Sequence, residues 1–444
     1  KREHCTQPQT KMEANLSILD FTEDLEEYNV AGLTAAVLDG GSVHEIVFGE
    51  AGRDRPMTTN DWIQHASFSK TVASVFAIEY FTNQDIPMTT GVNQIFRDIG
   101  SEFRLESKID CPAEWADSLQ LKHLLNHTAL GMHYVFGIPR EDGMASPIDL
   151  ISGAVDRYEP LMVAREPGSS FSYSGGGFVV LQHLIEEMEK KPVHEVTRSF
   201  LDGCGMVDYS FDQSQQGTQS DGAPHAYGHT DDREEVPTLM YPPFAAGGHG
   251  TPAAMANMLK HLSIAYHLPQ GSGPISHYTA KLMLGEESLL DKGCQDFMNS
   301  EMGLGVFVAK GITAEGEINK FMLHQAANDG FRGVFMICFD GPAAANGPKG
   351  FVLISNGDNR AMFMNCVVSK ALLKCLAIDG MDWSKVDNKT FNLAGLKQAE
   401  IVNLGLKELV LDALMSAQDV DVSADNSKFA YVSQESNVCV SQMV

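Results

Sequence analysis

The stretch from Asp61 to Tyr80 constrains the fold of this chain more than any other. Its apolar residues cover most of a helix circumference, which predicts a helix buried inside a protein: Val72, Val75, Phe76, Ala77 and Ile78. Ser67 and Lys70 stand at its start, three residues apart, so their side chains share one face and can meet. A lysine in a buried helix is costly unless it has a partner or a chemical task. The Ser-x-x-Lys spacing alone remains a hypothesis, because a chain of this size is expected to contain about one by chance.

Length and charge exclude several classes of function. The chain has 444 residues, enough for one large domain with an embedded subdomain or for two or three domains. Its formal net charge of -26 repels phosphate backbones and anionic lipid, so we expect neither nucleic acid nor membrane as a partner. No apolar run reaches the ~18 residues of a membrane-spanning helix.

The cysteines and the first residues bear on metal sites and compartment. The eight cysteines include no Cys-x-x-Cys pair and no cluster with histidine at zinc-ligand spacing, so we expect no metal site. The first ten residues are polar and lack the apolar segment of a signal peptide. The localisation stays unknown from sequence, with the cytoplasm slightly favoured.

The order of patterns along the chain predicts an α+β fold. Two β-rich runs, 30–38 and 42–48, flank an Asp-Gly-Gly turn and predict a hairpin. Residues 13–29 predict one amphipathic helix, and residues 90–240 are mainly helical with long loops. Strand patterns return near the other end, at 304–308, 320–323, 333–339 and 350–355, before a closing helix at 361–378. We therefore expect an antiparallel sheet built from both chain ends, with a helical subdomain inserted between them.

This reading divides the chain into three parts. Residues 1–66 and 241–378 form the sheet domain, and 67–240 form the helical subdomain with the Ser67 helix and the Tyr173 loop. Residues 379–444 form a C-terminal extension, a helix near 393–417 followed by a polar tail. This helix either packs back on the domain or contributes to a homo-oligomer contact.

The residues that could carry chemistry start from Ser67. The chain contains no Gly-x-Ser-x-Gly, His-Glu-x-x-His or Gly-x-Gly-x-x-Gly motif and no phosphate loop. A serine needs a base, and Lys70 can serve if burial lowers its pKa towards neutrality. A second group must then relay the proton. Tyr173, in the turn-rich loop between Pro167 and Gly177, is a candidate, although most loop tyrosines are packing residues.

Five segments occur in a familiar order: Ser67-Phe-Ser-Lys70, Leu124-Leu-Asn-His-Thr-Ala129, Pro167-Gly with Tyr173-Ser-Gly-Gly-Gly177, Ala245-Ala-Gly-Gly-His-Gly-Thr-Pro252, and His324-Gln-Ala-Ala-Asn-Asp-Gly-Phe331. Over roughly residues 15–378 the chain thus resembles the class C branch of the serine β-lactamase and penicillin-binding-protein superfamily. Within that superfamily it is most similar to the β-lactamase-related serine hydrolases and esterases. The resemblance implies the β-lactamase/transpeptidase-like fold.

The resemblance also implies roles for named residues. Ser67 would attack a carbonyl group and become acylated, with Lys70 and Tyr173 sharing general base and acid duty. The backbone N–H groups of Ser67 and Ala327 would form the oxyanion hole. The residues implied to bind substrate are His324, Gly175, Asn328 and His249. For His249, substrate contact and an ordinary loop position are equally favoured. No metal or organic cofactor is implied.

Departures from the family pattern narrow the substrate. Gly175 stands where β-lactamases usually carry an asparagine that contacts the substrate amide, which weakens an antibiotic-hydrolysis reading. Gln325 and Ala326 replace a small pair, so the methyl group of Ala326 is expected to narrow or redirect the cleft. His127 lies at a helix end and is expected to make a structural hydrogen bond.

These observations predict a serine hydrolase that cleaves an ester or amide of a small molecule through an acyl-enzyme. Three alternatives stay open. The first is an acyltransferase of the same fold, in which an alcohol replaces water. The second is a non-hydrolytic enzyme of secondary metabolism, catalysing an elimination or cyclisation. The third is a non-catalytic scaffold, which has no need of Ser67, Lys70 and Tyr173 together.

Overall fold

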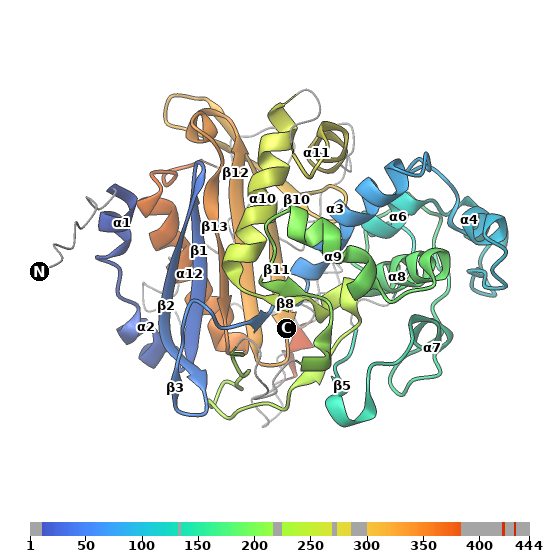
Figure 1. Cartoon of the computed structure of the whole chain (residues 1–444), viewed down its shortest axis with the longest axis horizontal. Helices are drawn as coiled ribbons and strands as arrows, with labels where there is room; N and C mark the ends of the chain where they lie inside the picture. The colour runs from blue at the N-terminus through green and yellow to red at the C-terminus, as the bar shows by residue number, and fades with distance from the viewer. Residues whose placement is uncertain are drawn as a thin grey trace, which may run out of the picture.

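The fold was analysed in a computed structural model of the chain (Figure 1). The structure describes residues 11–131, 135–215, 224–268, 273–285 and 300–382, together with two short strands, β14 (Val420–Asp421) and β15 (Ala430–Tyr431). The helix predicted near 393–417 lies outside the described residues.

The centre of the molecule is an eight-stranded sheet with the order β3-β2-β1-β13-β12-β11-β10-β9. Its strands are β1 (Gly32–Asp39), β2 (Ser42–Gly52), β3 (Arg55–Pro56), β9 (Glu301–Met302), β10 (Phe307–Ile312), β11 (Ile318–Asn328), β12 (Phe331–Asp340) and β13 (Lys349–Ser355). All neighbouring strands run antiparallel, and β1 lies between β2 and β13. The predicted antiparallel sheet built from both ends of the chain is therefore confirmed.

One face of the sheet is covered by helices from the two ends of the chain (Figure 1). These are α1 (Lys11–Leu16), α2 (Thr22–Glu27) and α12 (Asn359–Cys375). Alternate β1 residues, Leu33, Ala35 and Val37, share a hydrophobic core with them, as the two-residue period of a strand requires.

The single helix predicted over 13–29 is wrong, because the structure has two short helices there. The side chain of Asp20 accepts hydrogen bonds from the backbone N–H of Thr22, at 3.0 Å, and from its hydroxyl, at 2.6 Å. Such local bonds compete with helix continuation. Phe21 is buried at the break and its ring packs edge-on against Phe48, with centroids 5.2 Å apart.

The opposite face carries α3 (Phe68–Thr82) and α10 (Pro252–His267), and a helical lobe extends beyond them (Figure 1). The remaining helices are α4 (Val92–Asp98), α5 (Glu114–Ser118), α6 (Leu121–Leu125), α7 (Pro147–Ser152), α8 (Gly175–Glu189), α9 (Val193–Gly203) and α11 (His277–Leu284). Twelve of the fifteen α3 residues are buried, which confirms the buried helix predicted at Ser67.

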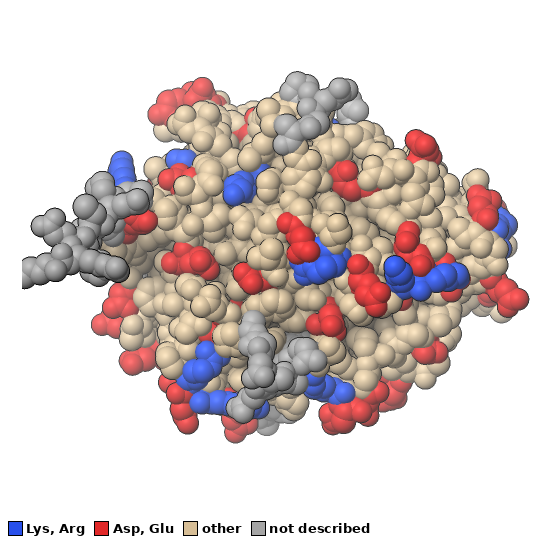
Figure 2. All heavy atoms as spheres, in the orientation of Figure 1, with Lys and Arg blue, Asp and Glu red and all other residues tan. Residues whose placement is uncertain are grey.

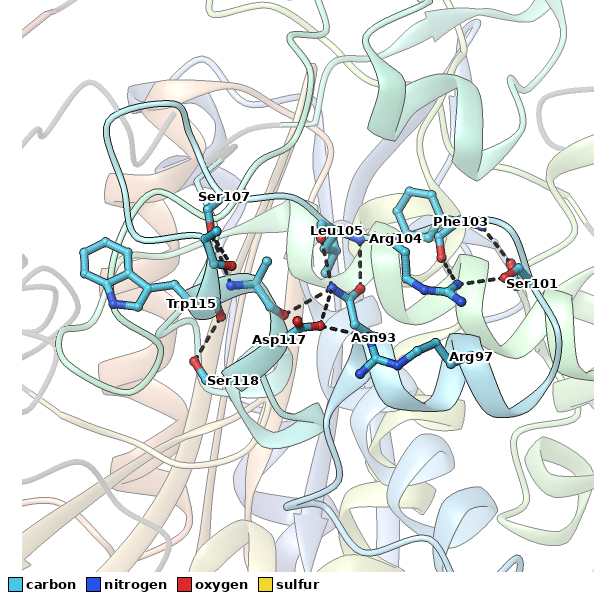
Figure 3. Close-up of polar contacts among 12 residues, drawn as sticks. Asn93, Arg97, Ser101, Phe103, Arg104, Leu105, Ser107, Trp115, Asp117 and Ser118 are labelled. Atoms are coloured by element: carbon cyan, nitrogen blue, oxygen red, sulfur yellow. Dashed lines mark hydrogen bonds and ion pairs between the residues drawn. The ribbon is translucent and has the colours of Figure 1, made fainter.

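Hydrogen bonds between side chains and backbone hold the short helices of this lobe together (Figure 3). The buried Asn93 of α4 donates to the carbonyl of Leu105 at 2.9 Å and accepts from its N–H at 2.8 Å. Arg97 of α4 pairs with Asp117 of α5 at 3.0 Å. Helices of five to seven residues are marginal alone, so such contacts and packing fix their positions.

The surface reflects the acidic composition. In Figure 2, Asp and Glu side chains are spread over the visible face, with Lys and Arg in smaller groups between them. The five cysteines in the described ranges are free thiols. None of the described helices combines the length and the apolar character needed to cross a membrane.

Candidate active site

A sharp turn brings Ser67 to the start of α3. Ala66, buried between β4 (Ile63–Gln64) and the helix, has a φ of 44°, in the left-handed region that residues with a Cβ rarely adopt. Ser67 follows as the residue that precedes the first helical turn. The turn redirects the chain from strand to helix within three residues, 65–67, and it leaves Ser67 partly exposed while Lys70 is buried.

The predicted contact between Ser67 and Lys70 is present. Lys70 Nζ lies 3.1 Å from Ser67 Oγ and donates to the carbonyl oxygen of Ala245 at 2.6 Å. The Lys70 residue is only 2% exposed. Burial lowers its pKa from 10.5 to about 7, because the charged form loses its hydration. The amine can therefore exchange a proton near neutral pH.

Aromatic rings form the surroundings of the lysine. Lys70 Nζ lies 4.9 Å from the centroid of the Tyr173 ring and 5.9 Å from that of Phe178. The Tyr173 ring stacks on His127, with centroids 4.4 Å apart and planes inclined by 26°. Tyr173 is thus brought beside Lys70, as the five-segment pattern implied, and its ring is fixed between His127 and the amine.

His127 positions the loop that carries Tyr173. Its Nδ1 accepts a hydrogen bond from the backbone N–H of Ser174 at 2.9 Å, and its carbonyl accepts from the N–H of Ser172 at 2.8 Å. These bonds bracket Tyr173 on both sides and match the structural role predicted for His127. Gly175 follows as the first residue of α8 and is buried.

A tight turn supplies the carbonyl that holds Lys70. The backbone N–H groups of Ala245, Ala246 and Gly247 all donate to the carbonyl of Pro242, at 2.9–3.1 Å. The segment Pro243–Gly247 is a single turn of π-helix, a form that is rare and frequent at functional sites. Next to it, Gly248 donates to Ser69 Oγ at 2.8 Å. A Cβ at Gly248 would lie 1.8 Å from the Tyr209 hydroxyl oxygen, so only glycine fits there.

The end of β11 borders the site. The last pair between β11 and β10 is Leu323 with Phe307, so residues 324–328 pair only with β12 among the described strands. His324 is buried here, and burial lowers its pKa to about 3, so it is neutral at physiological pH. Its ring lies 6.0 Å from that of Tyr173. Ala327, the expected oxyanion donor, lies three residues further along the strand.

The position of Ala326 corrects one expectation. Its methyl group was expected to narrow the cleft, but Ala326 is 4% exposed and belongs to the core. Its cross-strand partner is Gly333, and a Cβ there would lie 3.2 Å from that of Ala326 and 3.1 Å from the Phe68 ring. The missing side chain of Gly333 makes room for the methyl group beside Phe68.

Two of the expected substrate contacts have other partners. Asn328 Nδ2 donates to Gln64 Oε1 at 2.7 Å and to the carbonyl of Ala246 at 3.1 Å. His249 is buried on β8 (His249–Gly250), where its ring packs against Trp62 and His225 at centroid distances of 5.3 and 5.8 Å. Burial lowers the pKa of His249 to about 3. These contacts are those of packed or positioning side chains.

Sequence reasoning missed three partners of the site: the Ala245 carbonyl, Phe178 and Gln64. A backbone carbonyl leaves no trace in residue type, and Phe178 belongs to a long apolar helical run in which no residue type marks a contact with Lys70. In the described ranges, no group of three His, Cys, Asp or Glu side chains is placed to hold a metal ion.

Comparisons with known proteins bear on the family and the fold. A model of the β-lactamase family matches residues 19–365. The structure of the D-amino acid amidase from Ochrobactrum anthropi SV3 with D-phenylalanine is similar, with a TM-score of 0.62, 17% identity, and coverage of 83% of this chain and 99% of that one. The structure of the β-lactamase/D-alanine carboxypeptidase from Pseudomonas syringae has a TM-score of 0.58 and 13% identity, and the match covers 82% of this chain and 98% of that one.

A class C β-lactamase is also similar, with a TM-score of 0.59, 14% identity, and coverage of 84% of this chain and 98% of that one. At these identities the likeness shows the fold alone. A search of curated proteins found no match.

Proposed function

The chain belongs to the β-lactamase family, and we propose that it is a serine hydrolase that cleaves an ester or amide of a small molecule through an acyl-enzyme on Ser67. One observation carries the proposal. A buried lysine with a pKa lowered to about 7 lies 3.1 Å from the hydroxyl of a partly exposed serine. Burial of a lysine destabilises the fold, because its charged form loses hydration. A role as catalytic base explains why the chain carries a lysine at this buried position.

In the acylation step, neutral Lys70 takes the Ser67 proton as the serine oxygen attacks the substrate carbonyl. The Ala245 carbonyl accepts one N–H of the amine, which turns its lone pair towards the serine hydroxyl. Tyr173, whose ring lies beside the amine, passes the proton on to the leaving group. Water then attacks the acyl carbonyl and gives a proton to the same groups, which pass it to Ser67 Oγ as the acyl–oxygen bond breaks and the acid leaves.

The charge that develops on the carbonyl oxygen needs donors. We assign this role to the backbone N–H groups of Ser67 and Ala327, each able to contribute about 3–4 kcal/mol to transition-state stabilisation. Residues 324–328 lie at the end of β11, beyond its last printed pair with β10, and we propose that an extended substrate runs along this part of the strand. His324 and Gly175 are proposed to border the substrate. Asn328 and His249 are not, because their side chains are engaged elsewhere.

Gly175 favours esters and amides over β-lactams, because the side-chain amide that β-lactamases use at this position is absent. One structural neighbour is described as a D-amino acid amidase, which makes D-amino-acid amides a reasonable class to test.

The test is intact-protein mass spectrometry after reaction with fluorophosphonate, acyl esters, D-amino-acid amides and β-lactams. We expect a covalent adduct that maps to Ser67 and is lost in Ser67→Ala. Ser69→Ala should still form it, because Ser69 Oγ is buried against Gly248. Tyr173→Phe should slow turnover about 100-fold or more while the stack on His127 is kept.

The same experiment separates the alternatives. Acyl transfer to an added alcohol faster than hydrolysis would identify an acyltransferase. Full activity in Ser67→Ala with loss in Tyr173→Phe would identify non-hydrolytic chemistry. Absence of a Ser67 adduct at every pH tested would support a function as a non-catalytic scaffold and reject the proposed acyl-enzyme.

A further inference from the structure

Asn328 and Gln64 form a buried connection between the two sides of the site. Their residues are 6% and 5% exposed. Gln64 lies on β4, three residues before Ser67, and Asn328 ends β11, one residue after Ala327. The hydrogen bond between their amide groups, at 2.7 Å, therefore links the strand leading into Ser67 with the strand bearing the proposed oxyanion donor.

The second proton of the Asn328 amide goes to the turn that holds the lysine. Asn328 Nδ2 donates to the carbonyl of Ala246 at 3.1 Å, and the preceding carbonyl, that of Ala245, accepts from Lys70 at 2.6 Å. Adjacent carbonyls of one short turn thus contact Asn328 and Lys70. Movement of this turn would change the direction from which the Ala245 carbonyl meets the amine.

The residue types fit this arrangement chemically. A carbonyl oxygen accepts only, so the nitrogen of the Asn328 amide must face Ala246. The same nitrogen has a second proton, which requires an acceptor and finds Gln64 Oε1. Gln64 Nε2 in turn donates to the carbonyl of Leu239 at 3.2 Å. The two bonds of the Asn328 amide are buried and the Gln64–Leu239 bond is partly buried, so removing one partner leaves another without its bond.

We propose that Asn328 and Gln64 are positioning residues for the catalytic lysine. They hold the Ala245–Ala246 turn where the Ala245 carbonyl directs the Lys70 amine at Ser67. The inference rests on the proposed function for its catalytic meaning. It also gives Asn328 a role other than substrate contact, because both amide protons are already used.

The effect should appear in the titration of Lys70. The titratable side chains that face Lys70 are Tyr173, from the loop before α8, and His324, from β11. His324 stays neutral above pH 5, since burial holds its pKa near 3. Loss of the Asn328 contact frees the turn, admits water to the amine and moves the Lys70 pKa from about 7 back towards 10.5.

The test measures this pKa directly, by NMR of protein labelled with ¹³Cε-lysine, with the Lys70 resonance assigned by its absence in Lys70→Arg. In Asn328→Leu the titration of Lys70 should move up by about one pH unit or more. Acylation of Ser67 at pH 6 should then fall about tenfold, because the neutral fraction of the amine falls tenfold. Gln64→Met, which keeps the length of the side chain, should shift the titration in the same direction.

Asn319→Leu is the matched control. Asn319 is fully buried on the same strand, and its amide bonds Met381 Sδ and the N–H of Ala343, away from Lys70. The Asn319→Leu variant should be less stable than wild type, with the Lys70 pKa unchanged. This result would show that a shift in Asn328→Leu comes from the loss of positioning and not from a general destabilisation of β11.

Two results would overturn the inference: an unmoved Lys70 titration in both Asn328→Leu and Gln64→Met, or a raised KM in Asn328→Leu with the titration unmoved. A wild-type protein that forms no adduct at Ser67 would reject the proposed function instead, while the NMR titration would still decide whether these residues position the lysine.

Discussion

At the scale of single residues, the burial of Lys70 favours its use as a base and lowers the stability of the fold. The amine is buried among Tyr173, Phe178 and a backbone carbonyl, which gives it a pKa suited to a base at neutral pH. The same burial makes the folded protein bind the lysine proton less tightly than the unfolded chain does. The penalty is absent above pH 10.5, grows as the pH falls and is complete below about pH 7.

Lys70→Met should therefore stabilise the fold while abolishing acylation. We expect the free energy of unfolding at pH 7 to rise by about 1–3 kcal/mol, less than the pKa shift alone implies because the Ala245 carbonyl loses its donor. The gain should disappear near pH 10.5. Urea unfolding at both pH values and mass spectrometry of the Ser67 adduct provide the measurement. A variant less stable than wild type at pH 7 would show that the contacts of the lysine outweigh its burial.

At the scale of elements, the end of β11 and its turn into β12 position Ala327 and Asn328 beside the candidate site. The buried Arg332 donates to the carbonyls of Asn328 and Phe331, at 2.6 and 2.8 Å. It also pairs with Asp358 at 2.7 Å, just before α12. The backbone carbonyl of Asn328 thus accepts a hydrogen bond from Arg332, which is itself paired with Asp358. The side chain of Asn328 is held separately, by Gln64 and the carbonyl of Ala246.

Arg332→Met should cost about 3 kcal/mol of stability, because it leaves two buried carbonyls and the partly buried Asp358 carboxylate without their donor. Lys349→Met is the control on the same sheet. Its pair with Asp39 is 3.4 Å long and its side chain is 25% exposed, so we expect a loss below about 1 kcal/mol. Chemical unfolding of both variants gives the comparison. Equal losses would mean that the Arg332 pair contributes no more than a surface pair.

The sequence predicted elements better than the contacts between them. The β-rich runs located β1 and β2, the strand patterns located β11 to β13 and the start of β10, and the all-round apolar pattern located α3, because residue preference and periodicity are local properties. The contact of Ser67 with Lys70 followed from helix spacing. The contacts of Ala245, Asn328 and Gln64 could not follow, since they depend on a backbone carbonyl and on residues 64, 246 and 328 meeting in space.

At the scale of the whole molecule, the sheet and the helical lobe share one core. A single hydrophobic cluster contains Ala36 and Ile354 of the sheet, Phe76 of α3 and Phe178 of α8. Backbone bonds add to it: Gly305, near β10, donates to the carbonyl of Leu125 at 2.9 Å. The division into a sheet domain and a helical subdomain describes the path of the chain, while the apolar contacts cross that division.

A shared core predicts that the two lobes unfold together. Trp62 follows Asp61, whose carboxylate pairs with Arg55 of β3 in the eight-stranded sheet, and Trp115 lies on α5 in the helical lobe, so each tryptophan reports on one lobe. Two single-tryptophan variants, each with Phe at the other position and at Trp383, should give the same urea midpoint by fluorescence, and far-UV circular dichroism should agree. A lower midpoint for Trp115 alone would show a helical lobe that unfolds independently. In that case Tyr173, in the loop before α8, would separate from Lys70 before the sheet is lost, and activity would disappear at the first transition.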